Sequence, residues 1–362
     1  MWIASPRRRA VLRDLPILVV LSVGLLGCAG IGPSRLGSDH LQYARAISDA
    51  QKRQILLNIV RLRYGDTPTF LAVNQVISSY TLERSAELGL NVYPNARPGN
   101  YATGLAALNY SDHPTITFGP LSGEELARTA VRPLSPADLL PLAQGDLPID
   151  VLFRLGVQSV GSLRNTVVLG GEEGAGDPEF FELLAGMRRL QVRGMLTVRF
   201  VHRKDGNHVF LGIANASDPD MRVVAERTRQ LLGMAKGQTE AEVVYGRVVT
   251  GPGQIAILTR PIIAVLSQVS AEIEVPPGDV AAGRTVSSLP PARFGRPPIV
   301  NIHAGSAAPP GAYTTVGYRD AWFWIDDGDF NSKVAYTVLG MLIALMEGNT
   351  DGRAPVLTVP AG

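Results

Sequence analysis

The acidic run Asp326-Asp327-Gly328-Asp329-Phe330-Asn331 is the stretch whose residue types come nearest to a metal-binding motif. Asp327, Asp329 and Asn331 match the first three ligand positions of a calcium loop. The sixth and twelfth positions are Ser332 and Val338, where such a loop needs a glycine and a bidentate acid. We therefore expect no metal here, and we interpret Asp326, Asp327 and Asp329 as a strand-to-helix turn whose acids cap the following helix.

The histidines offer a second possible site. His202 and His208 flank the hairpin turn signal Asp205-Gly206. We interpret them as exposed or half-buried hairpin residues, and the alternative is that the two imidazoles face each other across the hairpin. A zinc site needs three or four ligands, and two imidazoles do not supply them. The sequence therefore predicts neither a metal nor another cofactor.

Motifs for covalent and nucleotide chemistry are missing from the sequence. It has no Gly-x-Ser-x-Gly elbow, no Walker loop and no Gly-x-Gly-x-x-Gly fingerprint. We therefore expect a protein that is not an enzyme. A hydrolase assembled from distant segments around Asp326, Asp327 and Asp329 remains the alternative.

The N-terminus carries the strongest functional signal. Arg7, Arg8, Arg9 and Arg13 precede an apolar run from Leu15 to Leu26, which has the length of a signal sequence and is shorter than the roughly 20 residues of a spanning helix. The run ends in Leu25-Leu26-Gly27-Cys28, which resembles the lipobox of bacterial lipoproteins. We expect cleavage between Gly27 and Cys28 and acylation of the Cys28 thiol.

Two further features agree with a lipid anchor. Cys28 is the only cysteine, and a lone thiol is unusual in an exported protein unless it is the lipid attachment point. Ala29 follows it, which resembles lipoproteins forwarded to the outer membrane. We predict anchoring at the periplasmic face of that membrane. Export by the general secretory route or, from Arg8-Arg9, by the twin-arginine route stays open.

Composition limits the kind of partner. Hydrophobic residues make up 46% of the chain and charged residues 18%, enough to form a core. The formal charge of +2 partly belongs to the signal arginines, so the remainder is close to neutral. This argues against a nucleic-acid partner held through phosphates. We predict a structural or partner-binding role with an envelope protein as partner, and a carrier of a small apolar ligand is a further alternative.

Patches of helix and strand without regular alternation predict an α+β fold with antiparallel strands. Helices are expected from Asp39 to about Arg63, after a capping box at Ser122, and after the start signals at Ser135, Leu147, Asp177, Asp218, Pro261 and Asp329. Strands are expected at 114–118, 196–200, 209–213, 242–249, 254–258, 299–303, 313–318 and 322–325, whereas 69–90 fits strand or helix equally. Gly251-Pro252-Gly253 is predicted as the turn between 242–249 and 254–258.

The predicted organisation has four parts. A signal peptide (1–27) precedes a lipidated tether (28–38), a mainly helical region (39–175) and an α+β region (176–362). Residues 276–298 are rich in proline, glycine and arginine, and we expect a flexible loop there.

Several segments together resemble an uncharacterised lipoprotein family of proteobacterial envelopes. They are Leu56–Tyr64 with Asp66-Thr67-Pro68, Asn109–Asp112 with Pro114–Thr117 and Pro120–Glu125, Pro148-Ile149-Asp150, and Phe323–Asp327. Gly328 replaces the charged residue expected after the last motif. The resemblance implies an exported lipoprotein without a known activity, and no site residue follows from it.

Overall fold

The computed structural model describes residues 33–91, 101–120, 130–145, 147–166, 174, 176–204, 206–288 and 296–348, with backbone alone for 33–40, 43, 71–91, 101–120, 207 and 346–348. The chain divides into two compact units, Met1–Ile55 and Leu56–Gly362. Cys28 and the predicted signal peptide lie outside the described residues, as does the predicted capping box at Ser122.

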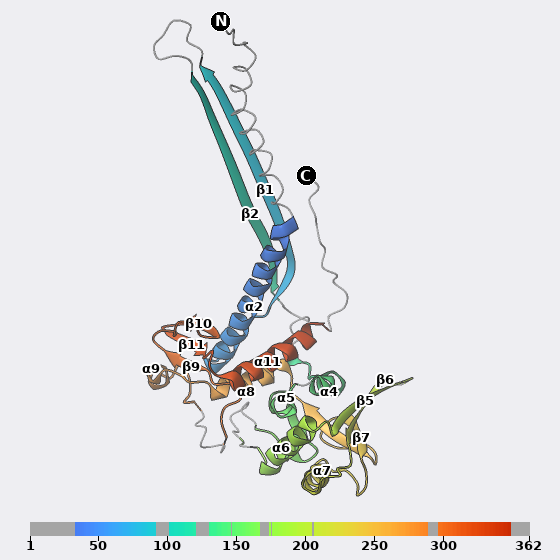
Figure 1. Ribbon diagram of the computed structural model, residues 1–362. Coiled ribbons are helices and arrows are strands. Elements are labelled where there is room, and N and C mark those ends of the chain that lie inside the picture. The colour runs from blue at the N-terminus through green and yellow to red at the C-terminus, as the bar shows by residue number, and fades with distance from the viewer. Residues whose placement is uncertain are drawn as a thin grey trace, which may run out of the picture. The chain divides into compact units, whose positions relative to one another are not determined.

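The fold is α+β, as predicted, with mixed sheets of mostly antiparallel strands (Figure 1). The largest sheet has the strand order β4-β3-β8-β7-β6-β5. Its strands are β3 (Val157–Val160), β4 (Leu163–Arg164), β5 (Leu196–Arg203), β6 (Gly206–Ile213), β7 (Glu240–Tyr245) and β8 (Gln254–Thr259). Their alternating apolar residues bury one set of side chains, such as Val209, Leu211 and Ile213 of β6.

One pair in this sheet differs from the prediction of antiparallel strands. β7 and β8 run parallel, with Glu242 opposite Gln254 and Tyr245 opposite Ile257. The chain must therefore return along the sheet between Gly246 and Gly253, which both adopt positive φ, 138° and 76°. The glycine-rich turn predicted between the two strands is thus the end of a return loop and not a hairpin.

Helices cover the sheet and form the rest of the core. They are α4 (Pro136–Gln144), α5 (Ile149–Gly156), α6 (Pro178–Val192), α7 (Pro219–Leu231), α8 (Ile262–Glu272) and α11 (Phe330–Gly348). All begin where the start signals predicted. The Ser135 hydroxyl accepts a hydrogen bond from Ala137 N at 3.1 Å, and the Asp218 carboxylate accepts one from Asp220 N. Helix α5 packs against α6, α8 and α11.

The smaller sheet has the order β10-β11-β9, all antiparallel. Its strands are β9 (His303–Gly305), β10 (Thr314–Tyr318) and β11 (Ala321–Ile325). β9 begins at the residue where the predicted strand 299–303 ends. Helix α9 (Pro277–Ala281) lies within the segment 276–298, so its described part is not the flexible loop that we expected.

The long hairpin of β1 (Leu71–Asn91) and β2 (Tyr101–Pro120) corrects two predictions. The ambiguous segment 69–90 is a strand, and the short strand expected at 114–118 is the last part of a strand of 20 residues. Serine, asparagine, aspartate and glycine between 103 and 113 are poor strand formers, so the sequence pattern did not predict the full length of this strand. The region 39–175 is therefore not mainly helical.

Two boundaries also differ from the predictions. Helix α2 (Pro33–Arg63) already includes the six residues before Asp39. Asp39 is therefore inside the helix and does not cap it. The chain also does not divide at residue 175, because β3 and β4 pair into the same sheet as β8.

A buried arginine joins three segments of the core. Arg260 is only 4% exposed and donates to the carbonyls of Arg154, Leu155 and Thr166. Burial lowers the pKa of Arg260 to about 10, and nearby Glu272 opposes that shift. The guanidinium thus stays charged at neutral pH and donates to carbonyls in the last turn of α5 and in the segment after β4.

Replacing this arginine tests its role. Arg260→Met should leave three buried carbonyls without that donor and lower the free energy of unfolding by about 2–4 kcal/mol. Urea denaturation at pH 7 measures the change. Arg247→Met, at an exposed position after β7, is the matched control and should change stability by less than about 0.5 kcal/mol. Equal effects of both variants would contradict the role of Arg260.

Candidate binding groove

An open groove of about 690 Å³ lies beside strand β9. Four segments line it: the chain from Glu274 through α9 to Asp279, the following residues Ala282, Arg284 and Ser288, the stretch Ala304–Ser306, and the turn at Asp320 and Ala321. Its volume is in the range of ligand sites in proteins, roughly 300–1,000 Å³. The side chains that fix these segments decide what the groove binds.

Asp279 is the buried acid of the groove, and only 8% of its surface is exposed. Its Oδ2 accepts a hydrogen bond from the Tyr64 hydroxyl at 2.6 Å, and its Oδ1 pairs with Arg284 Nη1 at 2.9 Å. The Tyr64 hydroxyl, and then Arg284, hold the pKa of the Asp279 carboxyl below its usual value. The groove therefore contains a fixed negative charge over most of the pH range.

Tyr64 follows the last residue of α2 and is held from several sides. Its ring is 5.2 Å from that of Tyr318 and 6.3 Å from that of Phe323, and the Arg319 guanidinium lies 5.0 Å above it. Burial, and then the bond to Asp279, raise the pKa of Tyr64, so its hydroxyl remains a donor at physiological pH.

The wall after α9 is tied to the same helix end. Arg63 donates to the carbonyls of Ala271 and Val286, and Thr285 Oγ1 donates to the Arg63 carbonyl at 2.7 Å. Ser288 Oγ donates to the carbonyl of Ile273 at 2.6 Å. These bonds explain why residues 276–288 adopt one conformation although their composition suggests a loop.

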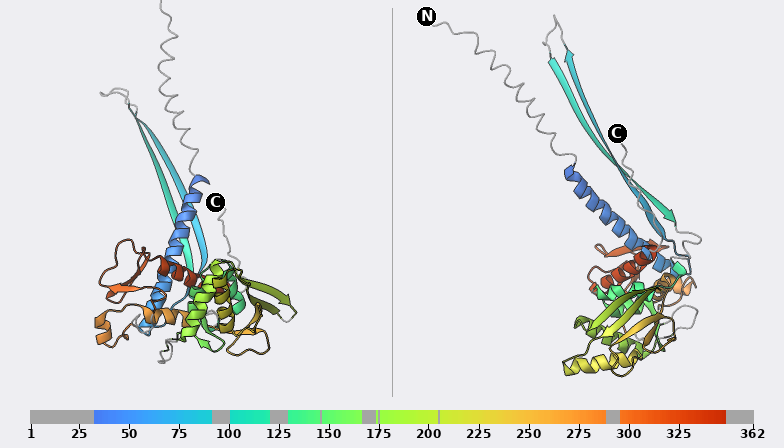
Figure 2. Two further views of the ribbon diagram at one scale, coloured as in Figure 1. Left: turned by 60° about the horizontal axis from the view of Figure 1, so that its bottom comes forward. Right: turned by 90° about the vertical axis from the view of Figure 1, so that its right-hand side faces the viewer.

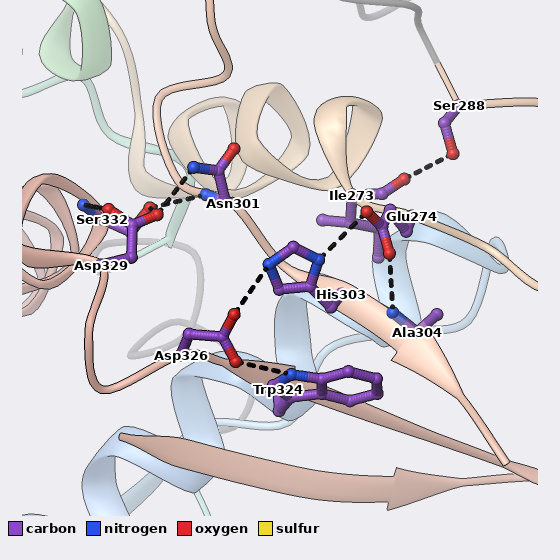
Figure 3. Close-up of polar contacts among 10 residues, drawn as sticks. All are labelled: Ile273, Glu274, Ser288, Asn301, His303, Ala304, Trp324, Asp326, Asp329 and Ser332. Carbon is purple, nitrogen blue, oxygen red and sulfur yellow. Dashed lines mark hydrogen bonds and ion pairs between the residues drawn. The ribbon is translucent and has the colours of Figure 1, made fainter. Parts of the chain in front are cut away.

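The opposite wall is set by His303, shown in Figure 3. Its Nδ1 is 3.0 Å from Glu274 Oε1, and its Nε2 is 3.4 Å from Asp326 Oδ2. The second oxygen of each carboxylate accepts a further bond, from Ala304 N for Glu274 and from Trp324 Nε1 for Asp326. His303 thus holds Glu274 at the groove from the strand side.

Gly305 lies at the floor next to this histidine, where a larger residue would be tightly packed. A Cβ at Gly305 would lie 3.1 Å from Cη2 of Trp324, closer than most real contacts allow. The Trp324 ring also lies 5.8 Å from the imidazole of His303. The packing of this ring leaves the backbone of residue 305 open to the groove.

The groove has an acidic lining. Three carboxylates, those of Glu274, Asp279 and Asp320, line it together with one guanidinium, that of Arg284. Apolar residues complete the lining, among them Val275, Pro276, Pro277 and Ala304. This combination suits a ligand with a positive charge beside apolar groups.

The acidic cluster named from the sequence does not form one site. Asp326 contacts Trp324 and His303, Asp327 Oδ1 lies 2.8 Å from Lys333 Nζ, and Asp329 accepts bonds from Ser332 and Asn301. Figure 3 shows Asp326 and Asp329 directed to separate partners. Asp329 caps α11 as predicted, and none of the three acids lines the groove.

His202 and His208 do not face each other across the hairpin, so the alternative of a histidine pair is wrong. Val201 is opposite His208 and His202 is opposite Asn207, so His202 and His208 belong to opposite faces of the sheet. A facing pair would need His202 opposite His208, which is one position away from the observed register. His208 instead bonds to Glu242 of β7. Across the described part of the chain, no three or more His, Cys, Asp or Glu side chains are placed to bind a metal.

Sequence reasoning did not find the Tyr64–Asp279 pair, because the two residues are 215 positions apart. The available signal was local: an acid directly after Pro276-Pro277-Gly278, at the start of a long loop.

No protein-family model, no curated protein and no solved structure matches the chain. Among the described helices, none has the length and apolar character needed to cross a membrane.

The Tyr64–Asp279 bond predicts how stability depends on pH. Asp279 has a lowered pKa in the fold, so its contribution is present above its unfolded pKa and is lost as the pH falls below about 4. Tyr64 has a raised pKa, and its contribution is lost as the pH rises beyond about 10. Tyr64→Phe should cost about 1–3 kcal/mol at pH 7 and flatten both limbs.

Urea denaturation between pH 3 and pH 11 measures this dependence. Tyr245→Phe is the matched control, because Tyr245 is exposed and should behave as the wild type. If the wild type and Tyr64→Phe lost stability in parallel on acidification, the hydroxyl would not be what holds the Asp279 carboxylate.

Proposed function

We propose that this protein is a lipid-anchored bacterial envelope protein that binds a basic segment of a partner protein in the groove beside β9. The observation that carries this proposal is the preorganised acid in the groove. Asp279 is buried, charged and fixed by two donors, and Glu274 is fixed by His303. A site whose charges are already oriented loses little entropy when a ligand binds.

The lining favours a peptide segment over the other ligand classes that we considered. Lysine or arginine has an apolar stem and a cationic end, which matches a groove of proline and alanine with three carboxylates. A carrier of a small apolar ligand needs a sizeable apolar cavity, whereas this groove is open and acidic.

A hydrolase is the second candidate that the sequence left open, and the geometry gives it less support. A nucleophile must lie within hydrogen-bond reach of a base. Both ring nitrogens of His303 face carboxylates, and the Ser288 hydroxyl donates to a backbone carbonyl. His303 and Ser288 are therefore not arranged as a base and a nucleophile.

The lipid anchor is tested by metabolic labelling with a radioactive fatty acid, followed by membrane fractionation. The wild type should be labelled and found in the outer-membrane fraction, whereas Cys28→Ala should be unlabelled because it lacks the thiol. Equal labelling of both, or a wild-type protein in the soluble fraction, would rule out the anchor at Cys28.

The groove is tested by photocrosslinking in cells. A photoreactive phenylalanine analogue at Ser306, an exposed groove residue, should give a discrete adduct with an envelope protein. Combining it with Glu274→Gln and Asp320→Asn should reduce the adduct about three- to tenfold, because two cation-binding carboxylates are removed.

Two controls separate the groove from the rest of the surface. The analogue at Val223, which is 71% exposed on α7, should not give this adduct. Glu226→Gln, which removes an exposed acid of the same helix, should leave the Ser306 adduct unchanged. An adduct insensitive to the groove variants, or none at Ser306, would contradict the proposal.

A further inference from the structure

The β1–β2 hairpin has a regular register that sorts its residues by type. From Gln75 onward the pairing is unbroken, with Val76 opposite Ile116 and Asn91 opposite Tyr101, after a single shift between Val73 and Gln75. Figure 2 shows the two strands running alongside each other. Because successive strand residues alternate between faces, even-numbered residues of both strands share one face and odd-numbered residues the other.

The two faces differ strongly in polarity. Most residues of the even face are apolar: Val76, Leu82, Ala86, Leu88 and Leu90 on β1, and Ala102, Ala106, Leu108, Tyr110 and Ile116 on β2. Most residues of the odd face are polar: Gln75, Ser79, Thr81, Glu83, Ser85 and Glu87 on β1, and Thr103, Asn109, Ser111, His113, Thr115 and Thr117 on β2. Such alternation over two whole strands is typical of a sheet with one dry face.

A hairpin of two strands does not provide that sheet by itself. β1 and β2 form a two-stranded sheet, and among the described strands none pairs with the outer edge of either. Isolated two-stranded hairpins are marginally stable in water, and long unpaired edges are templates for another strand. Both edges therefore offer backbone groups to a further strand.

We propose that the partner is a second copy of this chain, whose β2 pairs antiparallel with β1 of the first. Each copy has one free edge of each kind, so the pairing repeats from copy to copy and gives a head-to-tail assembly. The hairpins then form one continuous sheet with a common apolar face.

The charges of the hairpin select both this partner and its register. Within one chain Arg84 is opposite Leu108, and Asp112 is opposite Tyr80. A stagger of four residues between copies puts Arg84 opposite Asp112 on the apolar face. An even stagger also keeps the apolar residues of both copies on one face, which an odd stagger would reverse.

The same stagger also matches the polar face. Within one chain Glu83 is opposite Asn109 and His113 is opposite Ser79. A shift of four residues brings Glu83 of one copy opposite His113 of the next. One register thus pairs both sets of residues, and an opposite-charge pair such as Arg84–Asp112 contributes roughly 0.2–1 kcal/mol.

A lipid surface explains the hairpin less well. Arg84 and Asp112 occupy the apolar face at positions that do not face each other in one chain, and an arginine facing the middle of a bilayer costs about 2–4 kcal/mol. A neighbouring copy staggered by four residues places Asp112 directly opposite Arg84. The inference rests on the hairpin alone and does not depend on the groove or on its partner.

The test uses the full chain with two introduced cysteines and a short bis-maleimide linker. Glu83→Cys with His113→Cys should give a ladder of dimers, trimers and larger species, because the two thiols are opposite only between copies. Every variant also carries Cys28→Ala, so either single variant has one thiol and should give no species above a dimer. Glu83→Cys with Thr117→Cys, four residues out of register on the same face, is the matched control.

Charge reversal checks the register by a second route. Arg84→Asp should reduce the ladder about fivefold or more, and the additional Asp112→Arg should restore it. Circular dichroism of each variant verifies that the remaining fold is intact. No ladder from the Glu83→Cys, His113→Cys pair, an equal ladder from the off-register control, adducts only with other proteins, or no rescue by the double reversal would each overturn the proposal.

Discussion

The hydrogen bond between the Tyr64 hydroxyl and the buried carboxylate of Asp279 joins the parts of the protein on which the groove depends. Tyr64 follows helix α2, and Asp279 lies in α9. In the sequence, the hairpin and the strands of the six-stranded sheet come between these two residues. Burial of both groups makes the bond specific, because the Tyr64 hydroxyl and Asp279 Oδ2 would each lose this partner if the other moved. Arg63 and Arg284 add charged donors around it. A groove wall made of proline, glycine and arginine is thereby given one conformation.

Much of the fold was predictable because its signals are local. Cap residues such as Ser135, Asp218 and Asp329 mark helix starts through bonds to backbone N–H groups within three positions, and all three helices begin there. The α+β class follows from the same local patterns. The length of β2 was not predictable, because its middle contains poor strand formers that only pairing with β1 makes extended.

The candidate site was harder to predict, since its members meet only through tertiary packing. Glu274, His303 and Asp326 belong to three segments, and nothing in their spacing connects them. Conversely, Asp326, Asp327 and Asp329 are neighbours in sequence, yet each has a different partner. A dense local run of acids was therefore a good indicator of a helix cap and a poor indicator of shared chemistry. The parallel pairing of β7 and β8 was missed for the same reason, because a glycine turn does not specify where the chain re-enters a sheet.

The strict two-face register of the β1–β2 hairpin has a consequence for how this protein can evolve. A single residue inserted into or deleted from either strand would move the apolar residues beyond that point to the polar face, and the polar residues to the apolar face. A protein with such a change would lose the amphipathic sheet. Changes of hairpin length should therefore accumulate in steps of two residues, balanced between the strands, whereas loops elsewhere vary freely. The irregularity between Val73 and Gln75 is the place where an odd residue has already been accommodated, near the end of the hairpin where few pairs lie beyond it.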